Sequence, residues 1–103
     1  MPKFSRDKGM RFERLLVSLL KGKGIPAVRV PLSGASEFQK GDVIMDGEKV
    51  VEAKHRESGF TNIYKYIEGA DYLMVKQNND DPLVILRFND FVEMYLRAGK
   101  KCL

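Results

Sequence analysis

The sequence has one cysteine and one histidine among 103 residues, too few for a disulfide framework or a histidine- and cysteine-rich metal site. Cys102 has no second cysteine to pair with inside the chain, which fits a reducing compartment. No apolar run approaches the roughly 20 residues that span a bilayer, and no signal-peptide core follows the basic amino terminus. We therefore expect a cytoplasmic protein, in the host cytoplasm if its source is viral, with no membrane partner.

The length fits one domain with one hydrophobic core, so we expect a single domain over residues 1–103. The sequence contains no internal repeat, linker or low-complexity segment. Its composition, 44% hydrophobic and 31% charged, is typical of a globular protein. Eighteen Lys and Arg residues against 14 Asp and Glu give a net charge of +4, which favours a polyanionic partner such as nucleic acid.

Apolar periodicity predicts three helices and five strands. The spacing is helical over about 8–21, 60–68 and 90–97, and strands are expected over 25–32, on both sides of a turn at 46–47, and over 71–76 and 83–88. Residues 1–7 are predicted to be a mobile basic arm and residues 99–103 a tail. The order of helix, three strands, helix, two strands and helix predicts an α/β protein with a central mixed five-stranded sheet flanked by helices.

The most informative stretch is residues 41–54, which consists of two short apolar strands around Asp46 and Gly47. Glu52 and Lys54 are two residues apart, so on an extended strand they lie on the same face. In an antiparallel hairpin, the sequence numbers of any two facing residues add up to the same value. Asp42 therefore lies on the same face as Glu52 only if an odd number of residues connects the two strands. The sequence therefore predicts a three-residue or bulged turn, with Gly47 in the left-handed conformation.

Carboxylates that converge on one face repel each other unless a cation lies between them. A divalent metal, Mg²⁺ or Mn²⁺, removes this repulsion at Asp42 and Glu52, because hard cations prefer oxygen ligands. A metal site on a basic surface is what hydrolysis of a phosphodiester requires.

Four further residues and one loop before or after this stretch are candidates for a functional role. Glu13 borders the buried stripe of the first helix, as either a solvated edge residue or a functional carboxylate, and Arg14 faces solvent or a ligand. Arg29 lies in an apolar strand and needs a carboxylate, a phosphate or water as a partner. The polar loop 33–40 is placed to contact substrate. His55 is a surface residue or a phosphate contact, or else a general base or ligand.

The motifs together resemble those of the PD-(D/E)xK nuclease superfamily, and more closely those of the archaeal-type Holliday-junction resolvases. Gly41 stands where the superfamily has the proline of its name. The segments that carry the resemblance, in chain order, are Lys8-Gly9, Phe12-Glu13-Arg14, Arg29, Ser33-Gly34, Gly41-Asp42 and Glu52-Ala53-Lys54.

This resemblance implies a restriction-endonuclease-like fold and a metal-dependent endonuclease that works as a homodimer and cuts four-way DNA junctions by paired, symmetric incisions. Glu13, Asp42 and Glu52 match the acidic positions around the metal, Lys54 matches the catalytic lysine, and Ser33 matches the serine of a loop that joins the site. The residues expected to contact DNA are Arg14, Arg29, Lys40, His55 and Arg56. No small-molecule cofactor is expected.

Two other interpretations of the same residues stay open at this point. One is another nuclease of the superfamily, with a nicking, repair or restriction activity. The other is a catalytically idle DNA-binding module in which the acidic cluster is only a structural charge network. Strand-cut symmetry on a four-way junction separates the first from a resolvase, and loss of a motif residue would mark the second.

Overall fold

A computed structural model describes residues 3–30 and 42–101 of the chain. The chain divides into two compact units, residues 1–55 and residues 56–103. Among the described residues, no helix is long and apolar enough to cross a membrane. The described elements follow one another in the expected order of helix, three strands, helix, two strands and helix.

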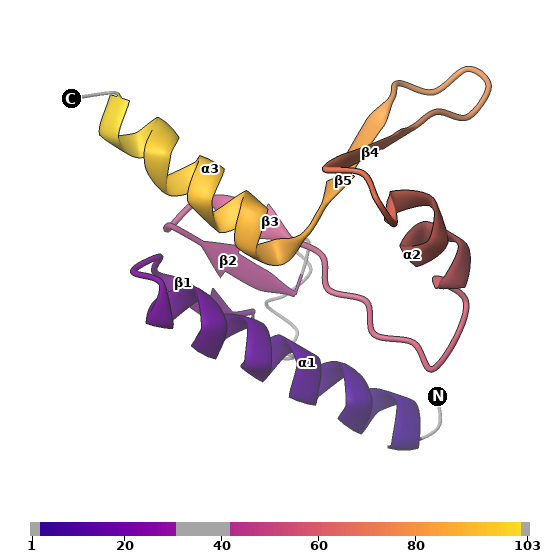
Figure 1. Cartoon of the computed structure of the whole chain (residues 1–103). Helices are drawn as coiled ribbons and strands as arrows, with labels where there is room; N and C mark the ends of the chain where they lie inside the picture. The colour runs from indigo at the N-terminus through magenta and orange to yellow at the C-terminus, as the bar shows by residue number, and fades with distance from the viewer. Residues whose placement is uncertain (1–2, 31–41, 102–103) are drawn as a thin grey trace. The chain divides into compact units, whose positions relative to one another are not determined.

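The first unit consists of one long helix and a three-stranded antiparallel sheet (Figure 1). The helix α1 spans Lys3–Gly22, and the strands are β1 (Ala27–Arg29), β2 (Val43–Met45) and β3 (Lys49–Val51). The strand order is β1-β2-β3, so β2 is central and β1 is an edge strand. The edge position of β1 agrees with Pro26 and Pro31, since proline cannot donate a backbone hydrogen bond to a ladder.

Packing of α1 against the sheet buries the core of this unit. The central strand β2 is buried over its whole length, and Val43 is fully buried. The other buried core residues of the unit come from the end of α1, from β1 and its flanks, and from β2: Leu20, Ile25, Ala27, Val30, Ile44 and Met45. This core fixes β2, and with it the residue that directly precedes β2.

The turn between β2 and β3 confirms the predicted register. Met45 pairs with Lys49, so three residues, 46–48, make the connection. Gly47 has φ 79°, the left-handed conformation that was predicted, and Asp46 also has a positive φ of 58°. Asp and Asn tolerate this conformation better than most residues with a side chain.

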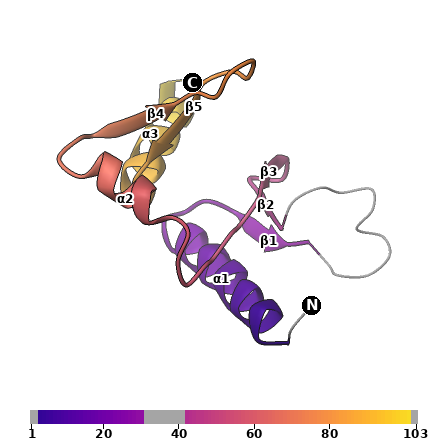
Figure 2. The ribbon, with the colours of Figure 1, turned by 90° about the vertical axis from the view of Figure 1, so that its right-hand side faces the viewer.

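The second unit contains α2 (Thr61–Ile67), the antiparallel pair β4 (Tyr72–Val75) and β5 (Leu83–Leu86), and α3 (Phe88–Lys101) (Figure 2). Arg87 ties the end of α2 to the start of α3. Its guanidinium donates to the carbonyl oxygens of Ala70 at 2.9 Å and Ile67 at 3.1 Å. Ile67 is the last residue of α2, and an arginine near the end of a helix can hydrogen-bond its last carbonyl groups.

Three sequence-based expectations need correction. The described strands form a three-stranded and a two-stranded sheet, both antiparallel, and not one mixed five-stranded sheet. Pairing of strands that are neighbours along the chain accounts for every ladder in the two sheets. The helix α1 begins at Lys3, within the expected arm, because no proline or glycine separates Lys3 from Lys8. Likewise α3 continues to Lys101, into the expected tail.

Candidate active site

The motif residues of the first unit gather where its three strands meet at one end of the sheet. The antiparallel registers place Arg29, the last residue of β1, opposite Val43, the first residue of β2. Val43 in turn lies opposite Val51, the last residue of β3. Asp42 directly precedes β2 and Glu52 directly follows β3, so both carboxylates belong to this end of the sheet, which we call the motif end.

Asp42 is held by its backbone and its side chain. Its carbonyl oxygen accepts a hydrogen bond from Val30 N at 3.0 Å, and its own N–H donates to Val51 O at 2.9 Å. Asp42 and Val43 thus both oppose Val51, a two-to-one pairing that forms a β-bulge and interrupts the strict alternation of side chains. The carboxylate Oδ2 accepts a hydrogen bond from Ala53 N at 2.9 Å. This last bond directs the Asp42 side chain toward the Glu52-Ala53-Lys54 segment.

Glu52 and Lys54 approach each other as their spacing predicts. Lys54 Nζ lies 3.6 Å from Glu52 Oε2. The side chains are 54% and 63% exposed, respectively, so both groups are available to a ligand from solvent. An exposed ion pair of this kind contributes little to stability, since water screens it and ordering two long side chains costs entropy.

Glu13 and Arg29 form a second ion pair, between α1 and β1. Arg29 Nε donates to Glu13 Oε1 at 3.1 Å, and the two side chains are 26% and 12% exposed, respectively. Of the three partners that the sequence left open for Arg29, the structure supplies the carboxylate. Glu13 borders the core, as expected from its place on the helix.

The basic candidates occupy different environments. Arg14 is exposed on α1. His55 is exposed, and its ring packs on Phe12 of α1 with 5.6 Å between ring centroids, so α1 contacts the chain just after the motif. In the second unit, the Arg56 guanidinium lies 5.9 Å from the centre of the Phe60 ring. Ser33 and Lys40 lie outside the described residues.

Sequence reasoning missed two of these partners. The Ala53 backbone amide, which holds Asp42, was not foreseen, because side-chain to backbone bonds depend on the detailed geometry of the bulge. The contact between Phe12 and His55 was not foreseen either, because Phe12 was identified only as part of a motif segment. The sequence did carry a signal for this contact, since Phe12 directly precedes Glu13. Consecutive residues of a helix lie about 100° apart, so Phe12 can contact a different part of the chain from Glu13.

Two carboxylates at the motif end, those of Asp42 and Glu52, have the chemistry that a divalent cation prefers. Within residues 3–30 and 42–101, no group of three or more acidic, histidine or cysteine side chains is close enough to hold a metal ion. The structure does not bring Glu13 into such a group, and one oxygen of its carboxylate is bonded to Arg29. Asp42 and Glu52 supply oxygen atoms, the ligands that Mg²⁺ and Mn²⁺ prefer, and a site with few protein ligands suits Mg²⁺, which retains several waters.

A hairpin that carries Asp42 before one strand and Glu52-Ala53-Lys54 after the next matches the motif order of the PD-(D/E)xK class of nucleases. Comparison with known proteins specifies the family. Residues 4–96 match the archaeal Holliday junction resolvase (Hjc) family, and the chain belongs to that family. It is therefore a DNA endonuclease that resolves Holliday junctions, and its family implies a divalent metal ion and a DNA junction substrate.

One curated relative is similar over most of the chain. The crossover junction endodeoxyribonuclease Hje of Saccharolobus islandicus (strain REY15A) is 28% identical over 102 residues, which cover 94% of this chain and 76% of that protein. No solved structure matches the chain. A cytoplasmic location, the homodimer, the identity of the metal and the lack of a small-molecule cofactor stay predictions.

Proposed function

We propose that the chain resolves four-way junctions by metal-dependent phosphodiester hydrolysis at the motif end of the first sheet. The observation that carries this proposal is the meeting of three strand ends there, which places Asp42 beside the segment that holds Glu52 and Lys54. In this proposal Asp42 and Glu52 hold Mg²⁺ or Mn²⁺, and Glu13 completes the acidic set from the α1 side. When bound, the metal supplies an activated water and neutralises charge on the phosphate.

The chain's own residues then divide the remaining work. Lys54, largely exposed and 3.6 Å from Glu52, orients or activates the attacking group or neutralises the phosphorane. The Ala53 amide keeps the Asp42 carboxylate oriented, because a bonded side chain has little rotamer freedom left. Ser33 is proposed, on the motif match alone, to join the site from the loop that precedes Asp42.

The direct test of this function uses three DNA substrates of equal length: a four-way junction, a linear duplex and a single strand. Each is incubated with Mg²⁺, with Mn²⁺ and with a chelator. We expect cleavage of the junction only when metal is present, and little or none of the other two substrates. Metal-independent cleavage, or equal cleavage of duplex and junction, would contradict the proposal, and equal cleavage would favour another activity of the superfamily.

The basic residues are proposed to bind DNA phosphates, and Arg14 offers the cleanest test because it is exposed on α1 and has no ion pair among the described residues. Neutralising one phosphate contact removes about one released counterion, so Arg14→Gln should lower the salt slope of junction binding by about one unit. It should weaken binding to all DNA sequences alike. Fluorescence anisotropy over a range of salt concentrations measures the slope, and an unchanged slope would remove Arg14 from the DNA surface.

The active unit is proposed to be a two-fold homodimer. Resolution into two duplexes requires cuts in two strands related by an approximate two-fold axis, and the sequence of one chain carries one set of acidic motif residues. Each chain of a symmetric pair uses the same apolar patch, so exposed apolar surface supports the proposal. The sequence offers six aromatic and aliphatic candidates for this patch late in the chain: Phe60, Ile63, Tyr64, Ile67, Phe91 and Tyr95.

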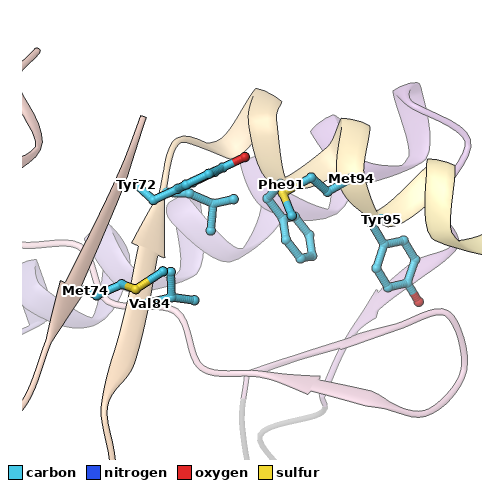
Figure 3. Close-up of a pocket in the computed structure, with 7 residues that line it drawn as sticks. Tyr72, Met74, Val84, Phe91, Met94 and Tyr95 are labelled. Carbon is cyan, nitrogen blue, oxygen red and sulfur yellow. The ribbon is translucent and has the colours of Figure 1, made fainter. Parts of the chain in front are cut away.

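These six residues line two apolar hollows in the second unit. Phe60, Ile63, Tyr64 and Ile67 line one of about 470 Å³. Phe91 and Tyr95 line another of about 370 Å³, which Figure 3 shows between side chains of the two strands and of α3. Large side chains at these hollows are widely exposed, 74% for Tyr64 and 71% for Met74. Ile67 is itself buried, so it supports the surface from beneath.

A further inference from the structure

Arg29 lies at the point where α1, β1 and β2 meet beside the motif end. It is the last residue of β1 and lies opposite Val43, the neighbour of Asp42. Directly facing residues in antiparallel strands have their Cβ atoms about 4.5–5.5 Å apart. The next residue, Val30, donates its N–H to the carbonyl oxygen of Asp42 at 3.0 Å. Arg29 therefore lies on the strand next to Asp42, beside the backbone that places it.

Arg29 holds Glu13, and it does so with only one edge of its guanidinium. The bond runs from Nε to Glu13 Oε1 at 3.1 Å. A carboxylate that is only 12% exposed is costly to leave unpaired, so this bond decides where the Glu13 side chain points. Arg29 is the only hydrogen-bond or ion-pair partner of Glu13 within residues 3–30 and 42–101.

The other edge of the guanidinium remains available. Arginine has five N–H donors in a planar fork, and the Nη1 and Nη2 groups of Arg29 make no hydrogen bond to the described residues. Two parallel N–H groups match two oxygens of a phosphate, which is the preferred geometry of arginine–phosphate contacts. At 26% exposure, the Arg29 side chain is also the member of the pair that is more accessible from outside.

We propose that Arg29 is a positioning residue that couples DNA binding to the placement of an active-site carboxylate. Its Nε orients Glu13, and its Nη edge binds a phosphate of the junction strand. A bound phosphate therefore holds the guanidinium in place, and the guanidinium in turn holds the Glu13 carboxylate in place. This inference rests on the proposed function, because it takes the motif end as the place of cleavage. It assigns Arg29 a role in the chemical step in addition to the electrostatic contact expected of a basic residue.

The test separates charge from geometry with Arg29→Lys, which retains the positive charge but has neither Nε nor a planar fork. In a chelator, this variant should bind a four-way junction within about threefold of wild type, since the charge that attracts phosphate is unchanged. Under single-turnover conditions with saturating protein and Mg²⁺, its cleavage rate should fall about a hundredfold, the effect of a small misplacement of an active-site group. Arg29→Gln should show the same loss in rate and also a lower salt slope, by about one unit.

A double-mutant cycle with Glu13→Gln shows whether Arg29 acts through Glu13. If it does, the combined variant should cut no more than about threefold slower than the slower single variant, because residues that act as a unit have non-additive effects. If circular dichroism shows that Arg29→Lys does not fold, the cycle uses Arg29→Gln. In the double variant Glu13→Gln/Arg29→Gln both side chains are neutral. The variant therefore avoids the destabilisation that an unpaired charge near the core would cause.

The matched control is Arg97→Lys, which changes an arginine that pairs with Glu93 on the surface of α3. It should leave both binding and cleavage within about twofold of wild type, since exposed ion pairs contribute little. Wild-type cleavage rates for Arg29→Lys, or effects that multiply with those of Glu13→Gln, would overturn the positioning role. A full salt slope in Arg29→Gln would overturn the phosphate contact. A wild-type protein that does not cut the junction with metal would instead refute the proposed function.

Discussion

Replacing Asp42 by asparagine is expected to lower junction cleavage at least about a thousandfold, since a metal ligand stabilises the transition state by several kcal/mol and each 1.36 kcal/mol is tenfold in rate. Asparagine has nearly the same shape as aspartate. Its carbonyl oxygen can still accept the hydrogen bond from Ala53 N, so the bulge and the hairpin should keep their structure. The loss then reports the carboxylate charge, which the metal requires.

Junction binding should respond in the opposite direction. Asp42 carries negative charge beside the proposed DNA surface, so Asp42→Asn should bind the junction as tightly as wild type or more tightly. Single-turnover cleavage and anisotropy in a chelator measure the two quantities separately. Asp46→Asn is the control, because it makes the same change in charge in the turn of the same hairpin, and it should cut at close to the wild-type rate. Much weaker binding by Asp42→Asn, with ordinary cleavage once bound, would show that Asp42 is not a metal ligand.

Mixing wild-type protein with a large excess of Asp42→Asn is expected to change the product from two resolved duplexes to junctions nicked on one strand. In a dimer, almost every wild-type chain is then paired with an inactive chain, and each active site cuts one strand. Junctions labelled on each strand in turn, and run on native and denaturing gels, distinguish nicked from resolved products. Sedimentation at micromolar concentration should give about twice the chain mass if the dimer is stable at that concentration.

The control mixes wild type with the same excess of Asp46→Asn, whose chains should remain active, so resolution should continue. Preincubation of the two proteins allows the subunits to exchange before DNA is added. Full resolution in the Asp42→Asn mixture, together with the mass of a single chain in sedimentation, would mean that a monomer makes both cuts and would rule out the dimer.

The register of the central hairpin could be predicted from the sequence, whereas the partner of Arg29 could not. If the motif residues share a face, the number of residues that connect β2 to β3 has to be odd. The pairing of Met45 with Lys49 confirms an odd number of connecting residues. The choice of Glu13 as the partner of Arg29 depends on how far α1 is rotated over β1, which the width of an apolar stripe leaves open. The stripe is in fact displaced, since Leu15 is 52% exposed while Leu20 is buried.

The arrangement of the strands was also beyond the sequence. Apolar periodicity locates strands but carries no information on which strands pair, so a five-stranded mixed sheet and two smaller antiparallel sheets are compatible with the same pattern. Local connections decided the outcome among the described residues, since β4 pairs with β5 and β2 with both of its neighbours. Ser33 and Lys40 lie outside the described residues, so their predicted roles stay predictions.

The way Asp42 is anchored has a consequence for how such an enzyme can diversify. Three of its atoms are bonded to residues on both sides of it: its carbonyl oxygen to Val30, its amide to Val51 and its carboxylate to Ala53. None of these bonds involves residues 31–41, which connect β1 to Asp42 along the chain. These three bonds therefore do not fix the length or the sequence of that connection. Evolution or a protein engineer can vary the connection around Ser33 to select a different DNA shape while these anchoring bonds, and with them the position of Asp42, are kept.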